Sequence, residues 1–191
     1  MKVKDLKIVM VCMILALTFL VGYRYTSLNS LYPNPSVVSV KLGEQLEING
    51  YTFSVDNWNR YNGAYVRELL PGYVMMTDDY GNVYSDEKVR VIITEMKIEN
   101  NTGKDTVLDL TSFAFESGAW HNQWDAVLFE KLNPLNPSIY LELKKGQSKV
   151  ITFPIHMYEF QFNKSDWKNI ENREFSIVFS TYPVKHVISG K

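Results

Sequence analysis

Leu46-Glu-Ile-Asn-Gly-Tyr-Thr-Phe-Ser-Val55 is the stretch that decides the fold class. Apolar side chains stand at every second position on both sides of Asn49-Gly50. A period of two is typical of a strand with one buried face. Asn-Gly between two such runs is the strongest short-range signal for a tight hairpin turn. The stretch therefore predicts a β-hairpin, and an all-β fold if the pattern recurs along the chain.

The same alternation recurs on both sides of this hairpin. Residues 88–99 form the longest expected strand, with Ile92, Met96 and Ile98 on one face and charged residues on the other. Turn signals follow at short intervals, and the domain shows one short helical turn, near Ser165–Ile170. About eight or nine short strands with this spacing predict a β-sandwich. Further expected strands are Val107–Phe115, Trp124–Phe129, Ile139–Leu143, Lys149–Ile155 and Phe175–Phe179.

The inner faces of such a sandwich define an expected core. Its members are the apolar residues that alternate along the expected strands. They are Phe53, Val55, Ile92, Met96, Ile98, Phe153, Ile177 and Phe179.

The N-terminal segment is apolar and flanked by cations. Residues 8–23 carry no charge, three lysines precede them and Arg24 follows. As a helix, these 16 residues rise about 24 Å, somewhat less than the ~30 Å of a bilayer core, and the flanking cations can reach the interface. No Ala-x-Ala-like cleavage site follows Phe19, which favours an uncleaved signal anchor over a signal peptide.

These features divide the chain into three parts. Residues 1–25 are expected to be a signal-anchor transmembrane segment, 26–36 a linker, and 37–191 the sandwich domain. Lysines before the apolar run favour a cytoplasmic N-terminus. We therefore expect a single-pass protein of the cell membrane whose C-terminal domain is extracellular. If the segment is cleaved, the domain is secreted.

Charge and cysteine content exclude several classes of partner. Residues 1–24 hold four Lys/Arg and one Asp, a net charge of +3, which leaves −4 for the rest of a chain with net charge −1. An acidic domain lacks the basic surface that binds nucleic acid. The one cysteine, Cys12, stands near the start of the apolar run, where a lipidated cysteine is not expected. Residues 37–191 therefore hold neither a disulfide nor a cysteine zinc site.

Three short patterns carry a resemblance to a known class of domain. They are Leu42-Gly43-Glu44 with 51–55, the strand 89–101 that ends before Thr102-Gly103, and the turn 143–147 before 150–153. Together they resemble the immunoglobulin-like (telokin-like) domains of unknown function on exported proteins of Gram-positive bacteria. The resemblance implies an immunoglobulin-like sandwich and no assigned catalytic residue. This chain departs from the pattern in a long insertion at 57–87 and in lacking a lipobox.

Two aromatic groups are candidate binding residues. Trp58, Tyr61 and Tyr65 lie in an Asn/Gly-rich stretch, and Trp120 and Trp124 flank His121-Asn122-Gln123. Exposed rings beside amides bind protein partners or stack on sugars. The first hypothesis is a non-enzymatic interaction domain that binds a protein through loops or a strand edge. The alternative is a cell-wall glycan-binding module. The alternative for these rings is that they pack over the ends of the sandwich.

No pattern predicts catalysis, a metal or a cofactor. The chain lacks Gly-x-Ser-x-Gly, P-loop and His-Glu-x-x-His motifs, and its three histidines, at 121, 156 and 186, stand alone. A triad assembled from distant residues stays open. The acidic residues around Asp78-Asp79 and Asp86-Glu87 are expected to form a solvated turn, with calcium binding as the alternative.

Overall fold

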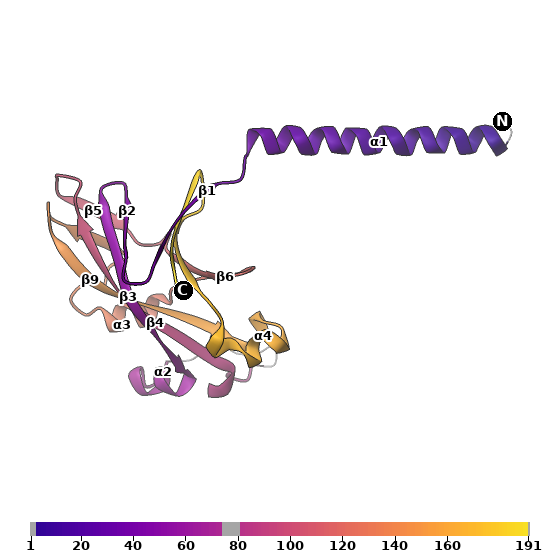
Figure 1. Cartoon of the computed structure of the whole chain (residues 1–191). Helices are drawn as coiled ribbons and strands as arrows, with labels where there is room; N and C mark the ends of the chain where they lie inside the picture. Colours follow the sequence, from indigo (N-terminus) through magenta and orange to yellow (C-terminus); the bar gives the residue numbers. More distant parts are fainter. Residues whose placement is uncertain (1–2, 74–80, 191) are drawn as a thin grey trace. The chain divides into compact units, whose positions relative to one another are not determined.

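The N-terminal unit is one long helix, α1 (Val3–Leu31) (Figure 1). The computed structural model describes residues 3–73 and 81–190 and divides into two units, Met1–Ser36 and Val37–Lys191. Residues Val9–Leu31 are long and apolar enough to cross a membrane, and none is buried. The helix continues six residues into the expected linker. The hydroxyl of Thr26 donates back to the carbonyls of Gly22 and Tyr23, so this polar side chain is satisfied within the helix.

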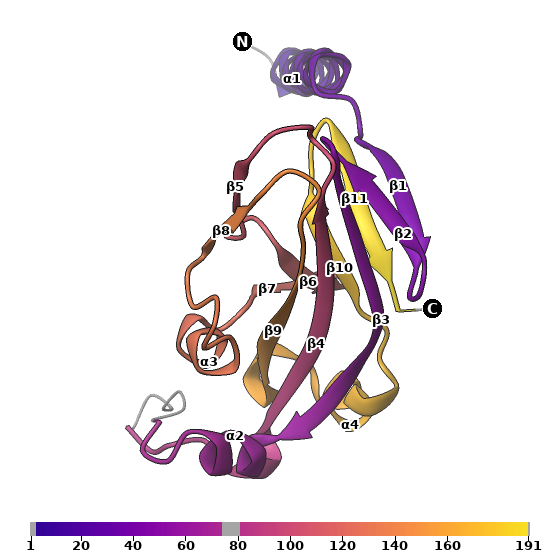
Figure 2. The same cartoon turned by 90° about the vertical axis from the view of Figure 1, so that its left-hand side faces the viewer.

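The second unit is a β-sandwich (Figures 1 and 2). One sheet has five strands in the order β1 (Ser36–Lys41), β11 (Val184–Ser189), β10 (Ser176–Ser180), β6 (Ala114–Ser117) and β7 (Trp120–Gln123). The other has four, in the order β2 (Gln45–Ile48), β3 (Tyr51–Asn62), β4 (Val89–Asn100) and β9 (Ser148–Tyr158). A separate two-stranded ribbon pairs β5 (Thr106–Asp109) with β8 (Tyr140–Leu143).

Short helices connect the strands. The α-helices are α2 (Gly63–Leu69), α3 (Ala126–Leu132) and α4 (Lys164–Lys168), and the 3-10 turns are η1 (Asp86–Lys88), η2 (Glu159–Gln161) and η3 (Ile170–Asn172). The expected helical turn near Ser165–Ile170 corresponds to α4 and the start of η3.

The predicted hairpin is present between β2 and β3. Ile48 pairs with Tyr51, and the two turn residues both have positive φ, 53° at Asn49 and 81° at Gly50. Positive φ at both positions is the type I′ geometry, whose twist matches that of the flanking strands. The turn sets a register in which Leu46 faces Phe53, so both side chains enter the core.

The predicted core is confirmed. All eight expected residues are at most 5% exposed. Ring contacts join the two sheets. The ring centroids of Phe53 and Phe179 are 4.7 Å apart, and those of Phe113 and Phe153 are 6.0 Å apart. The β-sandwich is therefore built around the alternating residues that define it in the sequence.

The described residues form eleven strands, more than the eight or nine expected. The expected strand Val107–Phe115 is interrupted, because Asp109 Oδ1 accepts the N–H of Thr111 at 2.8 Å and turns the chain between β5 and β6. The prediction of a strand at Trp124–Phe129 is wrong. Asp125 accepts the N–H of Leu128 at 2.8 Å and caps α3 instead.

The described parts of the insertion, residues 57–73 and 81–87, pack on the outer face of β4. β3 continues to Asn62, whose side chain caps α2, and α2 lies at the end of β3 and β4 (Figure 2). Val66 of α2 then packs in a second apolar cluster on this face. Its buried members are Val66, Val89, Val91, Ile93, Leu128 and Tyr158.

Candidate functional site

A partly buried cluster joins three side chains that lie far apart in the sequence. Asp125, the N-cap of α3, places Oδ2 3.2 Å from Nδ1 of His156 in β9. The hydroxyl of Tyr73 donates to the same oxygen at 2.7 Å. The backbone N–H of Asp125 donates to the carbonyl of Pro154 at 2.8 Å. The cap of one helix therefore also fixes a histidine on an edge strand.

The second ring nitrogen of His156 is unpaired. His156 is 4% exposed, and its Nε2 has no hydrogen-bond partner and no contact with solvent. The ionised carboxylate of Asp125 only accepts hydrogen bonds, so in the neutral form of the His156 ring the proton is on Nδ1 and Nε2 is an acceptor. A buried polar atom without a partner costs about 1–3 kcal/mol. Such an atom marks a place where a ligand can supply the missing bond.

His156 lies in the wall of a hollow of about 480 Å³, here named the His156 hollow. Aromatic rings, two amides and one carboxylate form its lining. The lining residues are Tyr73, Asn122, Gln123, Trp124, Asp125, His156 and Tyr158.

The electrostatics of the hollow are dominated by Asp125. Burial by itself raises the pKa of this carboxyl, but hydrogen bonds from His156, the Leu128 N–H and Tyr73 outweigh it and hold the pKa at about 2. Burial, together with the hydrogen bond to Asp125 and its charge, raises the pKa of the Tyr73 hydroxyl well above its usual value. At neutral pH the cluster therefore holds one carboxylate and one neutral phenol.

The sequence-predicted tryptophans contribute to the core. Trp120 is 9% exposed, stacks on Phe162 and meets Phe175 edge to face. The indole of Trp124 is partly buried, lies 4.5 Å from the ring of Phe129 and donates to a backbone carbonyl. These contacts match the alternative in which the rings pack rather than bind. Trp124 also lines the His156 hollow together with Asn122 and Gln123.

The other aromatic group is divided between two surfaces. Trp58 in β3 packs edge to face on Phe115, 5.8 Å away, and belongs to the sandwich core. Tyr61 and Tyr65 stack on each other at 4.0 Å and cover the second apolar cluster. None of these three side chains lines the His156 hollow.

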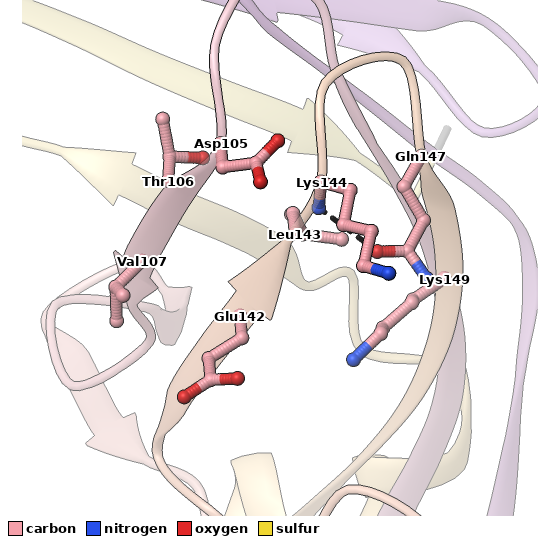
Figure 3. A pocket seen from close by; sticks show the side chains of 8 residues that line it. All are labelled: Asp105, Thr106, Val107, Glu142, Leu143, Lys144, Gln147 and Lys149. Carbon is pink, nitrogen blue, oxygen red and sulfur yellow. Dashed lines mark hydrogen bonds between the residues drawn. The ribbon is translucent and has the colours of Figure 1, made fainter.

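A second hollow, of about 460 Å³, lies beside the β5–β8 ribbon (Figure 3). Some of its polar groups already have partners, but Thr106 Oγ1 is buried without one. The N–H of Lys144 donates to Gln147 Oε1 at 2.9 Å, drawn as a dashed line, and Lys149 Nζ donates to Asn136 at 2.7 Å. Charges of both signs line it, so it favours no one class of ligand. The lining is Asp105, Thr106, Val107, Glu142, Leu143, Lys144, Gln147 and Lys149.

Sequence reasoning missed the Asp125–His156 pair. The two residues are 31 positions apart, and an isolated histidine gives no signal of its own. Asp78 and Asp79 of the calcium alternative lie outside the described residues. Within 3–73 and 81–190, no group of three His, Cys, Asp or Glu residues could hold a metal ion.

Solved structures similar in fold come from several bacteria. A conserved hypothetical protein of Bacillus anthracis is 14% identical, with a TM-score of 0.49 over 78% of this chain and 94% of that chain. An uncharacterized beta-sandwich protein of Clostridium difficile is 10% identical, with a TM-score of 0.44 over 82% and 96%. A secreted protein of Mycobacterium tuberculosis is 9% identical, with a TM-score of 0.46 over 82% and 98%.

No curated protein matches the chain. A family profile does match, over residues 38–186, which is most of the chain and nearly the whole sandwich. The chain therefore belongs to the family described as Domain of unknown function (DUF5028).

Proposed function

We propose that this protein is a membrane-anchored, extracytoplasmic binding domain without catalytic activity, and that it holds a protein partner at the His156 hollow. The domain would begin at residue 37, after an anchor that includes Val9–Leu31. Lysines before the apolar run favour a cytoplasmic N-terminus and a domain on the outer side.

One observation carries the choice of site. His156 is almost fully buried, is oriented by Asp125, lines the hollow and keeps an unpaired Nε2. A histidine–carboxylate pair also occurs in hydrolases, where it activates a hydroxyl or thiol. Among the residues that the structure describes, the lining contains no serine, threonine or cysteine. Binding therefore accounts for the pair better than nucleophilic catalysis does.

A cell-wall glycan is the alternative ligand. Trp124 beside Asn122 and Gln123 in the lining is the combination of ring and amide that sugar binding uses. The ring faces are largely taken, however. The ring of Trp124 lies against Phe129, and that of Tyr73 is parallel to His156, with 6.0 Å between centroids. A protein partner, which needs no open platform, is the preferred reading.

The topology is tested with protease added to intact protoplasts. We expect digestion of residues 37–191 and a membrane-bound chain that begins near Met1. Protection of the domain would contradict the topology. A new N-terminus between Gly22 and Tyr32 would show that the segment is a cleaved signal peptide.

The binding site is tested by capture with the detergent-solubilised full chain. His156→Asn keeps an N–H for Asp125 and removes Nε2, while His121→Asn changes an exposed histidine in β7. We expect a membrane partner that is captured by the wild type and His121→Asn and lost with His156→Asn at an unchanged melting point. Capture that is equal for all three forms would refute the site. Sedimentation with cell-wall material that depends on His156 would favour the glycan.

A further inference from the structure

The His156 hollow combines acceptors, a fixed negative charge and aromatic walls. We propose that it recognises an organic cation, specifically an aliphatic ammonium group such as a lysine side chain or a free amino terminus. The inference rests on the proposed function, because it names the ligand group that this same hollow takes.

The unfilled hydrogen-bonding positions of Asp125 and of the neutral His156 ring are acceptors. Nε2 of His156 has a lone pair and no partner. The carboxylate of Asp125 offers about four acceptor positions, and three are taken, by Leu128 N–H, Tyr73 O–H and His156. An ammonium group is a donor with three N–H bonds and no acceptor. It can therefore donate to the unfilled acceptor positions, whereas an ionised carboxylate or phosphate has only acceptors and cannot bond to them.

The charge of the hollow also favours a cationic ligand. No described lysine or arginine lines the hollow, and Asp125 supplies a carboxylate that is 21% exposed. The carboxylate accepts hydrogen bonds from Tyr73, the Leu128 N–H and His156, and no lysine or arginine of the described lining neutralises its charge. An incoming cation gains Coulomb attraction close to this carboxylate, and an anion is repelled.

The walls suit the carbon chain next to an ammonium group. The rings of Tyr73, Trp124 and Tyr158 line the hollow, and the ring of His156 lies between the two tyrosines, with centroids 6.0 and 5.9 Å away. Aromatic rings bury methylene groups and attract cations through their negative faces. Nε2 itself has no contact with solvent, so the ligand reaches it by displacing one of the flanking tyrosine rings.

Three small probes of equal length separate charge from size. They are n-butylammonium, 1-butanol and butyrate, each titrated into the solubilised full chain at neutral pH. The chain has three histidines, so the ring signals in an NMR spectrum can be assigned with His121→Asn and His156→Asn. We expect n-butylammonium to shift the His156 signal saturably, with a dissociation constant on the order of 1–10 mM. Butanol should bind at least about tenfold more weakly, and butyrate should cause no shift.

The variants and the outcomes decide between the two proposals. His156→Asn should abolish the saturable binding, and His121→Asn should leave it unchanged. Absence of a saturable shift, or a response to butanol or butyrate equal to that to n-butylammonium, overturns the cation assignment. If this occurs while capture of the membrane partner still depends on His156, the binding site stands and only its ligand class is wrong. If n-butylammonium binds but capture ignores His156, the proposed function fails instead.

Discussion

Asn133 holds the backbone of Thr152 with both ends of its side-chain amide. Nδ2 donates to the Thr152 carbonyl at 2.8 Å, and Oδ1 accepts the Thr152 N–H at 2.8 Å. Thr152 lies on β9, which is the last strand of its sheet and pairs on one side with β4. The buried amide therefore takes the place of a neighbouring strand at this position.

Other groups close the same edge further along β9. The carbonyl of Pro154 accepts the N–H of Asp125, and proline has no N–H to leave unpaired. The carbonyl of His156 accepts the Asn122 amide at 2.9 Å. An edge protected in this way does not pair with another strand. Binding by strand addition is thus blocked on β9 between Thr152 and His156, while the hollow beside it stays open.

Replacement of Asn133 should expose this edge. Asn133→Ala leaves the partly buried N–H and carbonyl of Thr152 without these partners, at a cost of about 2–4 kcal/mol of unfolding free energy. Urea unfolding of the solubilised chain measures this loss. Asn136→Ala is the control, because it removes only a partly exposed bond from Lys149 and should cost under about 1 kcal/mol. Equal losses of unfolding free energy in the two variants would contradict the role of the Asn133 amide.

The core prediction concerns Phe153, which is 2% exposed. Its ring lies 5.6 Å from that of Phe129, and Phe153→Ala leaves a cavity between the sheets. We expect a loss of about 3–5 kcal/mol in unfolding free energy. Phe160→Ala, at a ring that is 54% exposed, should cost about 1 kcal/mol or less. A loss below about 1 kcal/mol for Phe153→Ala would place the ring outside the core.

Substitution of two glycines separates the cost of a positive φ from the cost of a steric contact in the hairpin turn. Gly50 and Gly103 have nearly equal φ, 81° and 83°. A Cβ at Gly50 would lie 3.1 Å from Cγ2 and 3.2 Å from Cα of Thr102, whereas one at Gly103 meets nothing within 4 Å. Gly103→Ala should cost about 1 kcal/mol from the positive φ alone, and Gly50→Ala about 2 kcal/mol or more. Thermal unfolding should rank the two variants in that order, and the reverse order would contradict the contact.

The lowered pKa of Asp125 predicts that the unfolding free energy falls at acidic pH. Its folded pKa of about 2 lies below the ordinary value of 3.8, so the ionised carboxylate stabilises the fold fully above pH 3.8. That contribution, about 2 kcal/mol, is lost as the pH falls from about 4 to 2. Asp125→Asn is less stable at neutral pH and should lack this part of the acid-induced loss. Asp56→Asn, at an exposed position, should lose stability in acid as the wild type does. Unfolding curves measured from neutral pH to pH 2 for all three forms provide the test, and identical acid losses would refute it.

The sequence by itself determined the fold class, the main hairpin and the inner faces of the long strands. These features depend on neighbours close in the chain. The period of two fixes which side chains share a face, and Asn49-Gly50 admits the positive φ values that the turn needs. The apolar segment at the N-terminus is likewise a local property, since its length and lack of charge alone make it long and apolar enough to cross a membrane.

Only the tertiary structure decided the ends of the elements and the site. Asp125 follows Trp124 in what looks like a strand, but its carboxylate caps a helix and its N–H binds Pro154 across the fold. The structure also shows that described residues of the insertion pack on the second face of β4. There they help to bury Val89, Val91 and Ile93. His156 and Tyr73 meet at Asp125 because β9 and the chain after α2 pack against the cap of α3. Side chains brought together across 31 and 52 positions leave no periodic trace in the sequence, so their chemistry appears only when the sheets are assembled.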